Sequence, residues 1–184
     1  MATIHPTAVV AAGAELGADV VVGPFSVVSE GVRLGDGVVL ESHVSVTGDT
    51  TIGAGCRLSP FAAVGGAPQD LGYRGEPTRV EIGEGVTIRE NVSIHRGTAR
   101  GRGTTSVGRG CYLMAGSHVA HDCVLGEGVI VSNNVMMGGH TVIGDFVTIG
   151  GAAAIRQRLR IGNYAFISGI SGLAKDVIPF GYVI

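Results

Sequence analysis

An apolar residue recurs at every sixth position along most of this chain, and this period constrains the fold more than any other feature. From Ile4 the sixth residues are all aliphatic as far as Val64, and the phase resumes at Ile82 for three repeats. After a slip of one residue, the same spacing runs from Val107 to Leu173. Such a short period along a whole chain is typical of a solenoid, in which each repeat packs against its neighbours.

The remaining positions of the repeat indicate how it folds. The residue four positions after each repeat residue is small or β-branched, as in Ala8, Val38 and Thr50. Because alternate side chains of a strand point to one face, both positions are expected to point inward. Glycine is frequent directly after the repeat residue, and we expect it to open the corner between two short strands. Three repeats then close a triangular coil, and stacked coils pair in parallel about 4.8 Å apart.

The sequence therefore predicts an all-β chain, a left-handed parallel β-helix of hexapeptide repeats that forms a single domain over residues 1–184. The left-handed sense runs against the usual crossover rule and is inferred from the resemblance to hexapeptide-repeat proteins. Two segments break the period, Gly66 to Arg79 and Gly97 to Thr105, and both are expected to be loops expelled from a corner. Loops that leave a solenoid usually line its binding face.

Composition and charge exclude several classes of protein. The net charge of −2 argues against general nucleic-acid binding, and no apolar run reaches the length of a membrane span. The N-terminus lacks the features of a secretory signal, so a cytoplasmic location is expected. Cys56, Cys111 and Cys123 all fall four positions after a repeat residue. We therefore expect small core residues in a reducing compartment, with no disulfide framework.

Three of the six histidines are expected to meet at one corner of the coil. His95, His121 and His140 follow their repeat residues closely and lie three repeats apart, which places them on consecutive coils. Gly139 is expected directly above His121, where its N–H could donate to a developing oxyanion. A histidine base that faces a backbone donor is a constellation for acyl transfer. Asp122 either orients the His121 imidazole or is only a solvated polar residue of the turn.

Other interpretations of the same histidines remain open at this point. They could be structural residues of the turns, or zinc ligands, because imidazole is a common ligand of zinc. The γ-class carbonic anhydrases are hexapeptide β-helices with three-histidine zinc sites between subunits. Here His118 and His121 are three positions apart, whereas the motif of that family has a four-residue gap. A further alternative is an inactive scaffold for assembly.

Several stretches along the whole chain are specific enough to point to one family. They are Ile4-His5-Pro6-Thr7-Ala8, Gly23-Pro24-Phe25, Pro68-Gln69-Asp70-Leu71 with Gly75-Glu76-Pro77-Thr78-Arg79, Ile94-His95-Arg96-Gly97-Thr98, His118-Val119-Ala120-His121-Asp122-Cys123, Asn133-Asn134 and Gly138-Gly139-His140. In these stretches the chain resembles the bacterial UDP-N-acetylglucosamine O-acyltransferases, which begin the synthesis of lipid A, the anchor of lipopolysaccharide.

The resemblance implies transfer of a 3-hydroxyacyl chain from acyl carrier protein to the 3-hydroxyl of UDP-N-acetylglucosamine. It implies that His121 is the general base, that Asp122 orients it, and that the Gly139 N–H is the oxyanion donor. Contacts with the sugar nucleotide or the acyl chain are expected from Asp70, His95, His118, His140, Gln157 and Gly169. The position of Gly169 matches the acyl-length stop of the family, where small residues admit longer chains. By itself it could equally be an ordinary turn glycine.

The resemblance also implies the partners of the chain. The donor is carried on the phosphopantetheine of acyl carrier protein, so no cofactor and no metal is expected. Family members are homotrimers with sites between subunits. An acidic carrier protein suits a local group of arginines, which could also be a solvated loop. These arginines are Arg96, Arg100, Arg102 and Arg109.

The chain departs from the family at three places. Gly72 stands where many members have lysine, and Arg156 stands where histidine is common. Family members also continue into a C-terminal helical domain that helps to hold the nucleotide, and the sequence ends at Ile184 without one.

Overall fold

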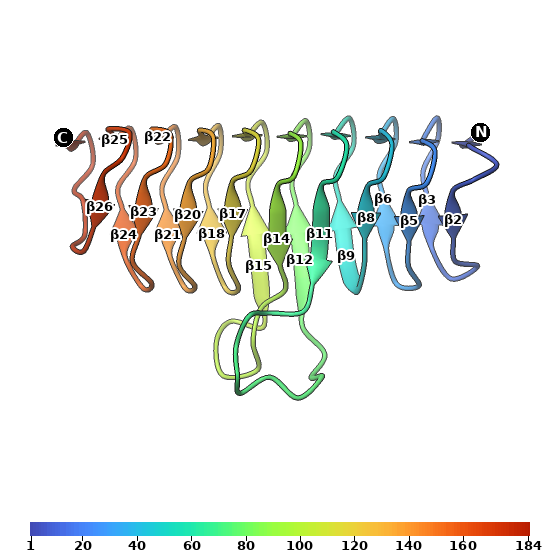
Figure 1. Cartoon of the computed structure of the whole chain (residues 1–184), viewed down its shortest axis with the longest axis horizontal. Helices are drawn as coiled ribbons and strands as arrows, with labels where there is room; N and C mark the ends of the chain where they lie inside the picture. The colour runs from blue at the N-terminus through green and yellow to red at the C-terminus, as the bar shows by residue number, and fades with distance from the viewer.

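The computed structural model describes residues 1–184 as one elongated three-sided coil, with its N- and C-termini at opposite ends (Figure 1). Most of its 27 strands have only two residues, and all of the strands pair in parallel. They form three sheets, and, except for the last strand, successive strands of the chain belong to successive sheets. The chain therefore turns a corner after every strand. No helix in the structure has the length and apolar character needed to cross a membrane.

Except for the last strand, which joins the first sheet, each sheet takes every third strand in turn. The first sheet contains β1 (Thr3–Ile4), β4 (Val21–Val22), β7 (Val39–Leu40), β10 (Arg57–Leu58), β13 (Thr87–Ile88), β16 (Tyr112–Leu113), β19 (Ile130–Val131), β22 (Thr148–Ile149), β25 (Phe166–Ile167) and β27 (Tyr182–Val183). The second sheet contains β2 (Val9–Val10), β5 (Val27–Val28), β8 (Ser45–Val46), β11 (Ala63–Gly66), β14 (Ser93–His95), β17 (His118–Val119), β20 (Met136–Met137), β23 (Ala154–Ile155) and β26 (Gly172–Leu173). The third sheet contains β3 (Glu15–Leu16), β6 (Arg33–Leu34), β9 (Asp49–Ile52), β12 (Arg79–Ile82), β15 (Thr104–Val107), β18 (Val124–Leu125), β21 (Val142–Ile143) and β24 (Arg160–Ile161).

The hexapeptide period places one apolar side chain of most strands in the core. Leu113 pairs with Val131, and Val131 pairs with Ile149, so residues 18 positions apart in the sequence lie directly above one another. All three side chains are fully buried. The expected core positions are confirmed for the repeat residues from Val22 to Leu173 and for the three cysteines, which are buried and free. In the first coil the expectation fails at Ile4, which is 45% exposed because no coil covers it on one side. Burial of apolar area on all three sides is the main source of stability in such a coil.

The corners differ from the expectation. The residue with positive φ is the third after the repeat residue, as at Asp122 (60°), His140 (61°) and Phe146 (56°). The glycine directly after the repeat residue therefore does not open the corner. At Gly126, a Cβ would lie 2.8 Å from the backbone nitrogen of Asp145 in the next coil. Glycine is needed at this position because the backbones of stacked coils approach closely.

Two loops leave the coil and lie side by side at one edge of it (Figure 1). Residues 67–78 connect β11 to β12, and residues 96–103 connect β14 to β15. Both loops start from the second sheet and return to the third, so they share a corner. The bounds expected from the sequence differ slightly from those in the structure, and the second loop begins at Arg96 instead of Gly97. Gly66, Arg79, Thr104 and Thr105 belong to the adjoining strands, because β12 and β15 pair over four residues and Gly66 pairs with His95 after an irregularity in β11.

Arg96 ties the first loop to the coil. Its guanidinium donates to the carbonyl of Gly65 (2.6 Å) and to the hydroxyl of Tyr73 (3.0 Å). The same guanidinium lies over the Tyr73 ring, 5.9 Å from its centre. These contacts hold the first loop beside the second.

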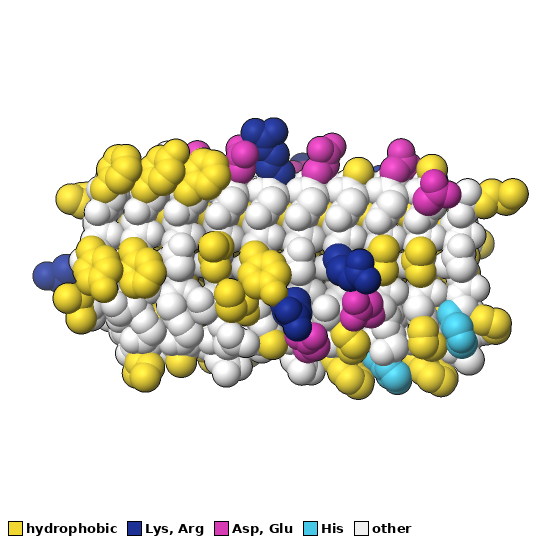
Figure 2. Space-filling view, turned by 90° about the horizontal axis from the view of Figure 1, so that it is seen from above, with side chains coloured by type: hydrophobic (Ala, Val, Ile, Leu, Met, Phe, Trp, Pro, Cys, Tyr) yellow, Lys and Arg dark blue, Asp and Glu magenta, His cyan; other side chains and the backbone are white.

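Vertical stacking also shows on the surface. Hydrophobic side chains gather toward the C-terminal end of the first sheet (Figure 2). At the corner that precedes this sheet, Tyr164 stacks between Phe146 and Phe180, with ring centres 5.3 and 5.1 Å apart. The spacing follows from the rise of about 4.8 Å per coil. Residues at equivalent corner positions of consecutive coils are therefore brought into contact, and the same relation builds the histidine cluster.

Candidate active site

His121 and Asp122 lie at the corner that follows β17 and form a hydrogen-bonded pair. The Nδ1 atom of His121 is 2.9 Å from Oδ2 of Asp122. The His121 side chain is 13% exposed, whereas that of Asp122 is completely buried. A carboxylate can only accept, so Nδ1 carries the proton while Asp122 is ionised. The Nε2 atom of His121 is then free to accept a proton from a substrate.

The second loop supplies further donors to the Asp122 carboxylate. The Thr98 hydroxyl donates to Oδ2 (2.7 Å), and the Thr98 N–H lies 3.0 and 3.1 Å from the two oxygens. The Gly103 N–H donates to Oδ1 (3.1 Å). Burial acts to raise the pKa of Asp122, but the hydrogen bonds from Thr98 and His121 outweigh it and lower this pKa below its usual range. The carboxylate is therefore ionised at neutral pH, and Asp122 orients the imidazole.

Gly139 lies above His121 in the next coil, as expected. A Cβ at Gly139 would lie 2.5 Å from Cε1 of His121, so only glycine leaves room for the imidazole. The Gly139 N–H donates to no acceptor in the chain. His140 follows, with its ring centre 4.9 Å from that of His121 and its Nδ1 3.7 Å from Asp122 Oδ2. The corner thus presents an imidazole nitrogen that can accept a proton and an unused backbone donor side by side.

The three expected histidines do not form a single stack. His95 instead meets His118, at 4.8 Å between ring centres, because the side chain of His118 points outward from β17 beside it. Burial, together with repulsion from His118, lowers the pKa of His95 to about 4. The pKa of His118 is also lowered, chiefly by burial, although Ser93 Oγ lies 2.7 Å from its Nδ1. Burial lowers the pKa of His140 as well. These three rings are thus kept neutral at neutral pH.

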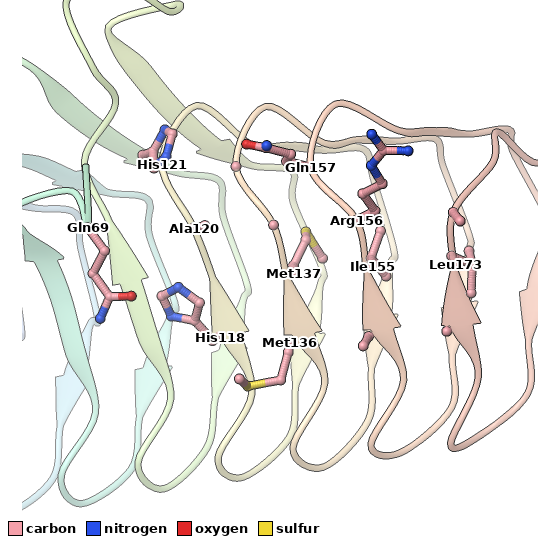
Figure 3. A pocket seen from close by; sticks show the side chains of 15 residues that line it. Gln69, His118, Ala120, His121, Met136, Met137, Ile155, Arg156, Gln157 and Leu173 are labelled. Carbon is pink, nitrogen blue, oxygen red and sulfur yellow. The ribbon is translucent and has the colours of Figure 1, made fainter. Parts of the chain in front are cut away.

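An open groove of about 750 Å³ begins at these histidines and runs along the second sheet toward the C-terminal end. Its lining comes from four consecutive coils and one residue of the first loop (Figure 3). The lining residues are Gln69, His118, Ala120, His121, Met136, Met137, Gly138, Gly139, Ala154, Ile155, Arg156, Gln157, Gly172, Leu173 and Ala174. The volume is in the range of small-molecule sites, and the far part of the groove is mainly apolar.

The structure places the other expected residues as follows. Gln157 lines the groove two coils beyond His121. Asp70 lies in the first loop, where it accepts from the Gly72 N–H (2.6 Å), and its charge acts on His140. Gly169 does not line the groove of this chain. It follows β25 and therefore belongs to the neighbouring corner.

Several residues of the site were missed in the sequence. Met136, Ala154 and Gly172 form the floor of the groove, and they lie 18, 36 and 54 positions after His118 along the second sheet. The 18-residue coil could have identified them as the outward neighbours of His118. Gln69 extends toward His118 from the first loop (Figure 3), and no periodicity signals its position. The role of Thr98 was missed for the same reason.

His121, Asp122 and His140 are the only group in the structure with atoms placed to hold a metal ion, within 4.8 Å of one another. Within one chain this group contains two histidines and a carboxylate. A carboxylate offers about four acceptor positions. Those of Asp122 are already occupied by Thr98, Gly103 and His121. The donor set therefore fits a hydrogen-bonded dyad better than a metal centre.

Comparison with known proteins places this site in a family. The model of the family described as "Bacterial transferase hexapeptide (six repeats)" matches residues 104–139. The acyl-[acyl-carrier-protein]–UDP-N-acetylglucosamine O-acyltransferase of Syntrophobacter fumaroxidans is 49% identical over 98% of this chain and 70% of its own length. The chain belongs to the UDP-N-acetylglucosamine O-acyltransferase family. The resemblance seen in the sequence is thus confirmed.

Two further members of this family are similar to the chain over nearly its whole length. The O-acyltransferase of Halorhodospira halophila is 52% identical over 98% of this chain and 70% of its own length. The structure of LpxA from Acinetobacter baumannii superposes with a TM-score of 0.96 at 42% identity, over 97% of this chain and 69% of that one. The structural likeness confirms the predicted left-handed β-helix. The curated relatives confirm the prediction that the chain is an acyltransferase. The chain spans about 70% of the length of these family members.

Proposed function

We propose that this chain transfers a 3-hydroxyacyl group from acyl carrier protein to the 3-hydroxyl of UDP-N-acetylglucosamine, with His121 as the general base. The substrates are those after which its relatives are named, and they agree with the resemblance described above. The observation that carries the proposal is the juxtaposition of two groups at one end of an apolar groove. One is the oriented His121–Asp122 dyad, and the other is the unused N–H of Gly139.

In the proposed reaction, Nε2 of His121 accepts the proton of the sugar 3-hydroxyl while that oxygen attacks the thioester carbonyl carbon. The carbonyl π electrons move to its oxygen, and the Gly139 N–H stabilises this oxyanion. When the oxyanion collapses, the bond between carbon and sulfur breaks. The protonated His121 then returns its proton to the leaving thiolate. Asp122 stays ionised and stabilises the imidazolium that forms between the two steps.

The acyl chain is proposed to lie in the groove along the second sheet. Beyond His118, the outward side chains become progressively smaller, from Met136 to Ala154 to Gly172. Three coils at about 4.8 Å each give a length of roughly 14 Å, comparable to an extended chain of roughly ten to twelve carbons. The groove therefore suits a long acyl donor.

Asp70, His95, His118, His140 and Gln157 are proposed to contact the sugar nucleotide or the acyl chain. The neutral rings of His95, His118 and His140 suit hydrogen bonds with hydroxyl groups. No cofactor is needed for the proposed reaction, because the carrier protein brings the activated acyl group. A cytoplasmic location is proposed because acyl carrier protein is a cytoplasmic partner.

The arginine group offers a smaller surface to this acidic partner than the sequence implied. Arg96 is engaged by Gly65 and Tyr73, and Arg109 pairs with Glu127 (2.9 Å). Arg100 and Arg102 form no ion pair in the structure, and they are the proposed contacts for the carrier protein.

A homotrimer is proposed because the site is open in a single chain. The groove lies on the outside of the coil beside an edge, and a neighbouring subunit would close it. Light scattering at micromolar concentration is expected to give three times the mass of the chain. A stable monomer with full activity would contradict this assembly.

The decisive experiment is a transfer assay with purified protein, UDP-N-acetylglucosamine and 3-hydroxyacyl carrier proteins of several chain lengths. The expected product is the 3-O-acylated sugar nucleotide, identified by mass spectrometry. Activity should persist after treatment with chelators and after removal of bound metal. Loss of activity on chelation, with stoichiometric zinc bound to the native protein, would favour the carbonic anhydrase-like alternative.

A further inference from the structure

The second loop, residues 96–103, has a feature that neither the fold nor the proposed function requires. Thr98 is buried, and both its hydroxyl and its N–H point at the Asp122 carboxylate. The Gly103 N–H closes the other side of the same carboxylate. Of the groups that donate to Asp122, only His121 lies outside this loop. The loop is thus a cradle of donors around one buried charge.

The loop approaches the carboxylate too closely for any residue other than glycine at two positions. A Cβ at Gly101 would lie 2.5 Å from Cγ and both oxygens of Asp122. A Cβ at Gly97 would lie 2.9 Å from Oδ1, and it would also collide with the backbone between Gly103 and Thr104. These glycines let the backbone close over the charge and exclude other acceptors and donors from it.

The main chain of Asp122 is held as well. Its N–H donates to the Thr105 hydroxyl (2.8 Å), and Thr105 lies in β15, directly after the loop. Asp122 itself has φ of 60°, a left-handed conformation that a non-glycine residue adopts at a cost. The loop and its return strand therefore determine both the backbone and the side-chain position of Asp122.

We propose that the second loop is a positioning device for the His121–Asp122 dyad, and that Thr98 is its principal positioning residue. This inference rests on the proposed role of His121 as a base. The Thr98 hydroxyl donates to Oδ2 of Asp122, the same oxygen that accepts the hydrogen bond from Nδ1 of His121. Its hydroxyl thereby fixes the rotation of the carboxylate and keeps one oxygen aimed at the imidazole. Thr98 does not line the groove and acts only through Asp122.

The test compares Thr98→Val with Thr98→Ser and with the control Thr104→Val. Valine removes the hydroxyl and keeps the shape, serine restores the hydroxyl, and Thr104 bonds to Arg79 instead of Asp122. Because hydrogen bonds to charged groups contribute more than neutral ones, Thr98→Val should lower kcat roughly tenfold or more and leave KM nearly unchanged. Thr98→Ser should recover most of kcat, and Thr104→Val should retain it.

A second readout does not depend on activity. In protein labelled with ¹⁵N at the histidine rings, NMR should find His121 as the single tautomer with the proton on Nδ1. Thr98→Val should show a mixture of tautomers or an exchange-broadened signal, and Thr98→Ser should not. If Thr98→Val does not fold, Thr98→Ala paired with Thr98→Ser makes the same comparison without the added methyl group.

The outcomes separate this inference from the proposed function. A Thr98→Val protein with unchanged kcat and an unchanged His121 tautomer, while His121→Ala is inactive, would overturn the positioning role alone. If His121→Ala keeps its activity, the proposed base is wrong, and any tautomer change on Thr98→Val would then report only a structural contact.

Discussion

Gly139 covers the imidazole of His121 so closely that a Cβ on the glycine would lie 2.7 Å from Nε2, the nitrogen proposed to act as the base. The two residues lie 18 positions apart, one coil of the helix, as the pairing of Val119 with Met137 shows. The stacking of two coils therefore brings the base and the proposed oxyanion donor together. Neither residue can be changed without affecting the other.

The first prediction concerns this contact. Gly139→Ala should push the His121 ring aside and disturb the backbone donor, so kcat should fall about 10²–10³-fold, the loss typical of a missing oxyanion donor. Gly151→Ala is the matched control, because Gly151 occupies the same repeat position at another corner and its Cβ would meet only the Asn133 carbonyl at 3.4 Å. Steady-state kinetics of both variants, with thermal unfolding to verify the fold, make the comparison. Equal activities of the two variants would show that Gly139 is not part of the active site.

The second prediction concerns the base itself. His121→Ala should lower kcat by at least about 10²–10⁴-fold, because general-base catalysis contributes that much. The fold should be retained, since the side chain projects from a corner and is not part of the apolar core. His43→Ala is the control, because His43 stacks between Phe25 and Phe61 far along the chain from the site. A His121→Ala protein with native kcat would exclude the proposed mechanism.

The third prediction concerns acyl-chain length. Gly172 lies at the far end of the groove, and a Cβ added there would meet no atom within 4 Å. Gly172→Met should therefore fold normally, fill the groove and shift the preference from donors longer than about ten carbons to shorter ones. Gly169→Met is expected to do the same through a neighbouring subunit, as the family resemblance implies. Competition assays with acyl donors of different lengths measure the preference of each variant.

The results of that competition locate the stop. A shift with Gly172→Met alone would place the stop within one chain, whereas a shift with Gly169→Met alone would place it at a subunit contact. No shift with either variant would contradict the proposed path of the acyl chain.

The fourth prediction concerns stability and pH. Burial and the neighbouring His118, His121 and Arg96 lower the pKa of His95 to about 4, whereas an unfolded histidine titrates near 6.5. Between these values the unfolded chain binds more protons, so His95 contributes stability above about pH 6.5 that is lost as the pH falls toward 4. We expect the Tm of the native protein to fall between pH 7 and pH 4.5 by about 2–4 °C more than that of His95→Gln. Scanning calorimetry at both pH values measures this difference, and parallel pH slopes for the two proteins would contradict it.

The sequence by itself determined the fold and the level of the site along it. An apolar residue at every sixth position can be buried only if the chain turns a corner after each short strand. This rule follows from the repeat itself and does not depend on contacts with the loops. The same period placed Gly139 over His121 and brought His121 and His140 to one corner, because a coil contains a constant number of residues. The motifs around His95 and His121 then carried the family resemblance, which the comparisons confirmed.

Only the tertiary structure decided how the site is held. The two loops have no period, so nothing in their spacing predicts that Thr98 donates to Asp122 or that Gln69 extends toward His118. The pairing of His95 with His118 also depends on which way each side chain leaves the coil, and it sets the burial that keeps these rings neutral. The turn conformation differed from expectation because close approach between stacked coils places glycine one step after the repeat residue. Such contacts and burial are properties of the folded coil, and local sequence carries no measure of them.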